Sequence, residues 1–207
     1  LLTLDFYGKN IFRVFQDPDG GIIRDPKSNP PAKILVDTPR HDVGALEVTE
    51  DDKTVAVATA EIKVSFDRHS GLMSVTDLRN GKVVAEETKE VDFGKGRTTF
   101  SLRNHDDEYF YGGGVQNGRF SHRGKRIEIV NTNSWTDGGV ASPAPFYWST
   151  KGYAAMPYTF KPGEYDFGST DKSTVTLTHD TSYLDMFLMV DSTPTALLRD
   201  YYQLTGN

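Results

Sequence analysis

Apolar and polar residues alternate with a period of two along most of this chain. In residues 60–66, Ile62, Val64 and Phe66 fall on one side and polar residues separate them. Successive side chains of a strand point to opposite faces, so this pattern predicts a strand with one buried face. The same signal predicts further strands at residues 10–15, 21–24, 72–78, 82–85, 126–130, 173–178 and 184–190.

Turn residues separate these predicted strands. Residues 17–20, read as Asp-Pro-Asp-Gly, predict a turn between strands 10–15 and 21–24, and residues 67–71 predict another. Asn80-Gly81 is a strong hairpin signal because both residue types tolerate positive φ. Proline-rich residues 25–40 predict an extended connection, and residues 94–97 a loop. Many short strands between turns predict an all-β fold, an antiparallel β-sandwich or barrel, over residues 1–190.

One helix is predicted, at residues 194–205. Thr193 suits the N-cap, Pro194 suits the first helical position, and Gly206 suits the end. Between them an apolar stripe recurs at helical spacing, which predicts packing against the sandwich; it consists of Leu197, Leu198, Tyr201 and Leu204. Residues 191–207 are therefore expected to form a short helical connection that leads out of the sandwich.

Composition narrows the function classes. The 207 residues are 37% hydrophobic and 12% aromatic, enough for a packed core, and the net charge of −6 argues against nucleic acid as a partner. No stretch reaches the roughly 18 apolar residues of a membrane span. The chain has no cysteine, which excludes disulfides, thiolate metal sites and a Cys nucleophile. No cellular compartment follows from the sequence.

The segment 109–153 is unlike the rest of the chain. Three consecutive glycines, Gly112 to Gly114, predict a sharp bend or a close approach to the backbone. Residues 131–145 predict a loop that carries Trp135 between Asn133 and Asp137. A flat aromatic face with amide and carboxylate neighbours is suited to a sugar, so these three residues are the candidate substrate-binding residues. The alternative is that Trp135 folds back to cover the sandwich.

No catalytic residue is assigned within the chain. The acidic runs Asp51-Asp52, Glu86-Glu87 and 106–108 are expected to be solvated turns. The five histidines lack metal-ligand spacing, and the glycine turn is followed by no phosphate-binding Lys-Ser/Thr and helix. We therefore expect no metal and no cofactor.

Beyond these single features, an ordered set of motifs resembles a known family. The set comprises Tyr111-Gly112-Gly113-Gly114, Arg123-Gly124, Trp135-Thr136-Asp137, Pro145-Phe146-Tyr147, Ser149 with Gly152-Tyr153, then residues 184–188, Thr193-Pro194 and residues 202–206. It is similar to the N-terminal domain of family 31 glycoside hydrolases, the α-glucosidase family. The resemblance spans residues 62–207, and the first sixty residues match only as a set of strands.

The resemblance implies a galactose-mutarotase-like sandwich followed by a (β/α)8 catalytic barrel. That barrel would carry the Asp nucleophile and the Asp acid/base of a retaining glycosidase, so neither maps onto these 207 residues. The implied role is a non-catalytic module of an α-glucosidase-type enzyme, with its own barrel and an α-glucoside oligosaccharide as partners. Residues 131–142 would reach the sugar site, where Asp137 would accept a hydrogen bond on the leaving-group side and Trp135 would pack against a ring.

Smaller features qualify that reading. Arg119, His122 and Arg123 are expected to hold neighbouring segments together rather than to contact sugar. Val115 stands where the family usually has Glu, which favours a subgroup with an altered substrate, including glucosyl transfer instead of hydrolysis. Two other readings stay open: a stand-alone carbohydrate-binding module, and a sugar mutarotase, for which we find no suitable His and carboxylate pair.

Overall fold

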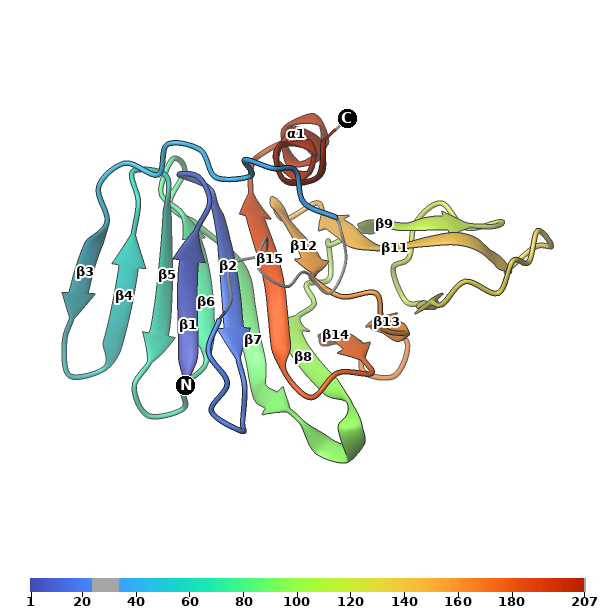
Figure 1. Cartoon of the computed structure of the whole chain (residues 1–207), viewed down its shortest axis with the longest axis horizontal. Helices are drawn as coiled ribbons and strands as arrows, with labels where there is room; N and C mark the ends of the chain where they lie inside the picture. Colours follow the sequence, from blue (N-terminus) through green and yellow to red (C-terminus); the bar gives the residue numbers. More distant parts are fainter. Residues whose placement is uncertain (24–33, 207) are drawn as a thin grey trace.

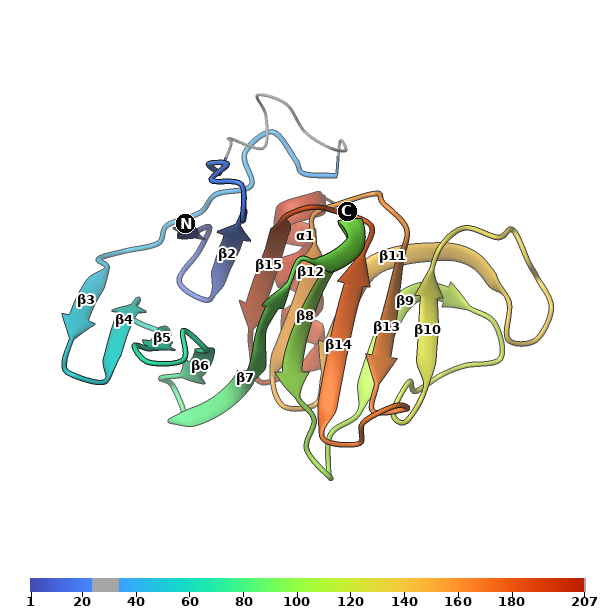
Figure 2. The same cartoon turned by 90° about the horizontal axis from the view of Figure 1, so that it is seen from below.

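The computed structural model describes residues 1–23 and 34–206. In this part of the chain the strands form two antiparallel sheets that pack face to face (Figure 1, Figure 2). One sheet has the order β1 (Leu2–Phe6), β2 (Ile11–Gln16), β15 (Leu184–Val190), β12 (Tyr153–Pro157), β11 (Val140–Ser149), β9 (Phe110–Gln116). The predicted antiparallel β-sandwich is confirmed.

The second sheet is longer and extends past the first at the β3 end (Figure 1). Its order is β10 (Arg126–Ile129), β13 (Gly163–Phe167), β14 (Thr174–His179), β8 (Thr98–Arg103), β7 (Lys82–Asp92), β6 (Met73–Asp77), β5 (Ile62–Asp67), β4 (Thr54–Ala58), β3 (Glu47–Glu50). Strands predicted at 60–66, 72–78, 126–130, 173–178 and 184–190 are confirmed as β5, β6, β10, β14 and β15. The loop predicted at 94–97 contains a short 3-10 turn, Gly94–Gly96.

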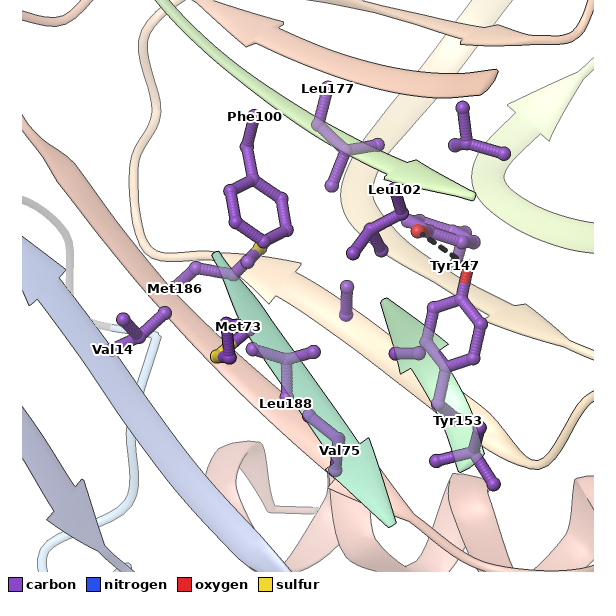
Figure 3. Close-up of a cluster of buried hydrophobic side chains, with 14 of the residues drawn as sticks. Val14, Met73, Val75, Phe100, Leu102, Tyr147, Tyr153, Leu177, Met186 and Leu188 are labelled. Carbon is purple, nitrogen blue, oxygen red and sulfur yellow. Dashed lines mark hydrogen bonds between the residues drawn. The ribbon is translucent and has the colours of Figure 1, made fainter. Parts of the chain in front are cut away.

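The main core lies between the two sheets and draws on the inward faces of both (Figure 3). In β5 the alternation works as predicted: Ile62 and Val64 are fully buried, whereas Lys63 and Ser65 are half-exposed. Burying each large apolar side chain contributes about 1.5 to 3 kcal/mol, so this layer supplies most of the folding free energy. Its largest fully buried members include Phe12, Phe100, Phe110, Tyr147, Tyr153, Tyr165 and Phe167.

The strand predicted at residues 21–24 is wrong. The turn predicted at 17–20 forms, and the Gly20 N–H donates to the Asp17 carbonyl at 3.2 Å. Residues 21–23 are not in a strand, and Arg24 lies outside the described residues, as does most of the predicted connection 25–40. The reason is pairing: β2 is hydrogen-bonded to β1 on one edge and to β15 on the other. No edge of β2 remains for residues 21–24, and the strand that pairs with it is the N-terminal β1 instead.

The hairpin at Asn80-Gly81 forms with a longer loop than a two-residue turn. Asp77 pairs with Lys82, so four residues make the connection, and only Gly81 of the pair has positive φ, at 73°. The Asp77 carboxylate accepts from the Arg79 backbone and from the Asn80 amide. This buried aspartate therefore organises the loop, which the Asn-Gly dipeptide alone does not indicate.

The acidic run 106–108 is not uniformly solvated, which corrects the expectation from sequence. Glu108 is fully buried, where its carboxylate accepts from the Ser149 hydroxyl and from the His105 backbone N–H at 3.0 Å. Burial raises the pKa of Glu108 above its ordinary value, because the charged form is poorly solvated there. The Tyr147 and Tyr153 hydroxyls lie 3.2 Å apart in the same part of the core (Figure 3). Glu108 thus belongs to the internal packing.

Helix α1 (Pro194–Thr205) lies against the outer face of the six-stranded sheet (Figure 1), as the predicted helix and its stripe require. The Thr193 hydroxyl accepts from the Ala196 N–H at 3.2 Å, the predicted N-cap. Leu197 and Leu204 are buried, and Leu198 and Tyr201 pack against the same cluster. A second, smaller core therefore joins the helix to the sheet.

Asp200 on α1 is a half-buried carboxyl where the helix meets the β1–β2 turn. It accepts from the Asn10 amide at 2.8 Å, beside Asp191, Glu61 and Arg79. Burial, with a smaller contribution from Asp191 and Glu61, raises the pKa of Asp200 to about 7. A carboxyl with a raised folded-state pKa favours the folded state when protonated, so its contribution falls as pH rises from about 4 to about 7.

We therefore expect the Asp200→Asn variant to gain stability relative to the parent between pH 5 and pH 8. Asn keeps an acceptor for Asn10 but cannot ionise. The measurement is the free energy of unfolding in urea at several pH values across that range. A parallel pH dependence in both proteins would show that Asp200 ionises freely in the folded state.

Candidate functional site

The candidate site lies at the end of the molecule farthest from β3, where β9 and β11 extend beyond the other strands (Figure 1). Loop 117–125 follows β9, and loop 130–139 precedes β11. The loop predicted over residues 131–145 is shorter than expected, because β11 already begins at Val140. Pro143 and Pro145 are tolerated in β11 because β12 pairs only with Tyr147, Trp148 and Ser149, which leaves the proline section hydrogen-bonded on one side at most.

The three glycines of β9 permit a close approach of β11, as the sequence predicts. All three have positive φ, from 77° to 115°. A Cβ on Gly112 would lie 2.6 Å from the Phe146 carbonyl oxygen, and a Cβ on Gly114 would lie 2.5 Å from the Ala144 nitrogen. Register shifts in β11 fall at the same place, between Pro143 and Tyr147. The glycines therefore fix the path by which β11 leaves the sandwich.

Backbone hydrogen bonds brace the two loops against each other. The Asn117 N–H donates to the Gly139 carbonyl at 3.0 Å, and the Gly138 N–H donates to the Asn117 carbonyl at 2.9 Å. The Asn117 side-chain amide donates to the Ser134 carbonyl at 2.7 Å. Loop 130–139 is thus held at both ends of its turn by one residue of loop 117–125. Asn117 is a positioning residue that the sequence pattern did not single out.

All three sequence-predicted site residues project from this braced loop. Trp135 is 73% exposed, so it does not fold back over the sandwich in this structure. Its indole N–H donates to the Asn133 side-chain oxygen at 3.3 Å, and Asn133 has a φ of 50°. Asn133 and Asp137 are also exposed. Among the described residues no hydrogen bond or ion pair engages the Asp137 carboxylate, which leaves it available to a ligand.

The basic residues of loop 117–125 hold the extension together, as expected from sequence. His122 is buried, and its Nε2 donates to the Gly112 carbonyl at 2.8 Å while the ring stacks on Phe167. Burial lowers the pKa of His122, which keeps the ring neutral at physiological pH. Arg123 donates to the His105 carbonyl at 2.9 Å and to the Glu108 carbonyl. Arg119 donates through Nη1 to the Arg126 carbonyl at 2.9 Å.

A row of aromatic side chains runs across the outer face of the extension and onto α1. Trp148 stacks on Tyr111 with ring centroids 4.4 Å apart, and Tyr111 meets Phe120 edge-on at 5.5 Å. On the other side of the row Phe146 packs against Tyr201 of α1 at 4.2 Å. Phe120 is 86% exposed. We call the six residues Phe120, Tyr111, Trp148, Phe146, Tyr201 and Tyr202 the aromatic row.

No group of three or more His, Asp or Glu side chains is placed to hold a metal ion within residues 1–23 and 34–206. Over the same residues, no helix has the length and apolar character needed to cross a bilayer. The groups that this site exposes are the polar and aromatic side chains of loop 130–139.

Comparison with solved structures shows the fold in larger enzymes. A family 31 dextranase from Flavobacterium johnsoniae, solved with isomaltotriose, has a TM-score of 0.88 and 16% identity over 99% of this chain. A family 31 α-xylosidase from a soil metagenome has a TM-score of 0.81 and 19% identity over 99% of this chain. A cycloalternan-forming enzyme from Listeria monocytogenes has a TM-score of 0.81 and 17% identity over 97% of this chain. This chain spans 25%, 32% and 19% of those proteins, respectively.

A family model identifies the domain. The description "Glycosyl hydrolase 31 N-terminal galactose mutarotase-like domain" matches residues 1–166. The match includes the first sixty residues, which the motifs left unassigned, and covers the glycine turn, loop 130–139 and the aromatic residues of β9 and β11. The chain therefore belongs to the N-terminal, galactose mutarotase-like domain family of the family 31 glycoside hydrolases.

Proposed function

We propose that this domain is the non-catalytic N-terminal module of an α-glucosidase-type family 31 enzyme. In this role the sandwich, residues 1–190, packs against a catalytic barrel and lends loop 130–139 to its sugar site. Residues 191–207 form the helical connection toward that barrel. The observation that carries the proposal is the braced loop, on which Trp135, Asn133 and Asp137 are exposed while Asp137 has no partner among the described residues.

The aromatic row supports contact with a further domain. Phe120 and Tyr202 are 86% and 46% exposed, and they lie at its two ends. The four residues between them are buried or half-buried, so the surface open to a partner consists of these two rings and the accessible edges of Tyr111, Trp148 and Tyr201. The row runs from α1 to Phe120, which lies in the same loop as Gly118, the residue that the Asp137 carboxylate approaches. This arrangement suits a sugar site completed by two domains.

The proposal is tested by measuring kcat/KM for the Asp137→Ala variant of the enzyme that contains this domain. Asp137 would accept a hydroxyl on the leaving-group side, and a hydrogen bond to a charged group contributes about 1.5 to 3 kcal/mol. We expect kcat/KM for an α-linked glucose disaccharide to fall by about tenfold to a hundredfold. An aryl α-glucoside has no leaving-group sugar and should be processed as before.

The matched control is Asp52→Ala, since Asp52 is an exposed carboxylate in the β3–β4 turn. This variant should leave both substrates unaffected. If Asp137→Ala leaves the kinetic constants for the disaccharide unchanged, the proposed role of the loop is wrong.

A stand-alone carbohydrate-binding module is the second candidate, because the exposed Trp135 and its polar neighbours all lie on this chain. A titration of residues 1–207 with glucose, maltose, isomaltose and nigerose separates the two. Saturable binding by this chain alone favours the binding module, and no binding favours a site that needs the barrel. Product analysis of the enzyme that contains the domain separates hydrolysis from glucosyl transfer.

A further inference from the structure

An open depression lies beside the turn that carries Asp137, where the two braced loops meet. Its volume is about 480 Å³, within the roughly 300 to 1,000 Å³ of small-molecule sites. Charged side chains and glycine backbone line it: Gly118, Arg119, Lys125, Arg126, Asp137 and Gly138. Loop 117–125 contributes half of these residues, including Arg119, which the sequence assigned to holding neighbouring segments together.

The acceptor of the depression is the Asp137 carboxylate, and Gly118 decides where it lies. The carboxylate occupies the position that a Cβ on Gly118 would take. Gly118 also has a φ of 69°, a conformation that residues with side chains rarely adopt. Asn117 ties the two loops together, and Gly118 leaves room for the carboxylate opposite it. Asp137 is therefore held at the depression while its oxygens stay free of hydrogen bonds within the described residues.

The donors are Arg119 and Lys125. Arg119 is anchored through Nη1 by the Arg126 carbonyl, and its Nη2 lies 3.8 Å from the Cβ position of Gly138, directly over the turn. The Lys125 backbone is fixed at both its N–H and its carbonyl, by His122 and Phe167. Within the described residues no carboxylate pairs with either side chain. Arg126, by contrast, is committed to Glu164 and Asp166.

This set of groups suits a neutral ring that carries neighbouring hydroxyls. Each hydroxyl can donate to a carboxylate and accept from a guanidinium or an ammonium. An anion is a poorer fit, because Asp137 would lie against it and Arg126 is already neutralised by its partners. The flat guanidinium of Arg119 can bridge two neighbouring oxygens, which a point charge does not do.

We propose that Arg119, with Lys125 beside it, is a specificity-determining residue that binds one ring of the oligosaccharide on the leaving-group side. Arg119 donates to a hydroxyl adjacent to the one that donates to Asp137, so the pair selects sugars with two neighbouring hydroxyls. This inference rests on the proposed function and extends the same site to loop 117–125.

The test is a calorimetric titration with isomaltotriose and with glucose, using the enzyme that contains this domain with its barrel nucleophile replaced so that the trisaccharide is not cleaved. We expect Arg119→Gln to weaken isomaltotriose binding by about tenfold to a hundredfold, since charged hydrogen bonds are lost. Lys125→Ala removes a side chain that pairs with no carboxylate among the described residues, and it should weaken isomaltotriose binding by a few fold. Glucose, which has no leaving-group ring, should bind all variants equally. Arg103→Ala, an exposed arginine on β8, is the matched control.

The outcomes separate this inference from the proposed function. If Asp137→Ala weakens isomaltotriose binding and both Arg119→Gln and Lys125→Ala leave it unchanged, the loop role stands and the present inference is overturned. If none of the three variants changes it, both fail. A further arm uses glucuronate and inorganic phosphate as competitors. Displacement of isomaltotriose by either, abolished by Arg119→Gln, would overturn the neutral-ring assignment in favour of an anion site.

Discussion

Replacing Asp185 by alanine should lower the free energy of unfolding by about 3 to 5 kcal/mol, among the largest effects expected from one side chain here. Asp185 on β15 and Arg13 on β2 are 7% and 3% exposed, and two hydrogen bonds of 2.7 Å join them. The guanidinium also lies 5.5 Å from the Tyr158 ring centroid and 5.6 Å from that of Phe187. Removing the carboxylate would deprive a buried guanidinium of its two charge-assisted hydrogen bonds.

Two further variants separate the loss of one charge from the value of the pair. In Arg13→Met with Asp185→Leu both charges are replaced by apolar groups of similar volume, and most of the lost stability should return. The exposed pair Arg97–Asp180, about half accessible on both sides, is the matched control, and Asp180→Ala should cost at most about 1 kcal/mol. Urea unfolding of the set measures all three. Equal losses for Asp185→Ala and Asp180→Ala would contradict the burial argument.

The sequence pattern predicts strands well where one face is buried and the other meets water. In β5 and β6 apolar and polar positions alternate, and both are found close to the expected bounds. The pattern missed β12, one of the strands whose two faces are both covered. All five residues of β12 are buried, because the main core lies on one side and the α1 cluster on the other. A strand of that kind has no alternation to detect.

Local sequence patterns also do not predict which strands pair or which polar side chains are buried. The segment 21–24 looks like a strand, yet β2 has no free edge to accept it. Glu108 looks like part of a solvated run, and only the approach of Ser149, forty-one positions later in sequence, makes it an internal acceptor. Such outcomes depend on contacts between distant segments, which single-sequence reasoning does not contain.

Part of the candidate site could be proposed from the sequence. Trp135, Asn133 and Asp137 stood out because aromatic, amide and carboxylate groups are unusual together in a glycine-rich loop, and they do project from one loop. Their placement depends on Asn117 and Gly118 from another loop, whose bonds and close contact are visible only in three dimensions. The sequence therefore indicated the candidate ligand-binding groups, and the structure identified what holds them.

Replacing Gly114 by alanine should be about as disruptive as losing the buried aspartate, at about 2 to 5 kcal/mol. A Cβ there would lie 2.5 Å from the Ala144 nitrogen and 2.7 Å from the Pro143 carbonyl carbon, so backbone rather than a flexible side chain must move. The φ of 77° adds strain of its own. Gly124→Ala is the control, since φ is 69° there but nothing lies within 4 Å of the new Cβ. It should cost only about 1 to 2 kcal/mol.

The difference between these two alanines isolates the close approach of β9 and β11. Hydrogen exchange should show lost protection in β9 and in residues 140–145 for Gly114→Ala, and unchanged protection there for Gly124→Ala. Because that section of β11 leads directly into loop 130–139, Gly114→Ala should also weaken oligosaccharide binding without removing any ligand contact. Equal stability of the two variants would mean that the strands separate at little cost. In that case the glycines would not be what positions Asp137.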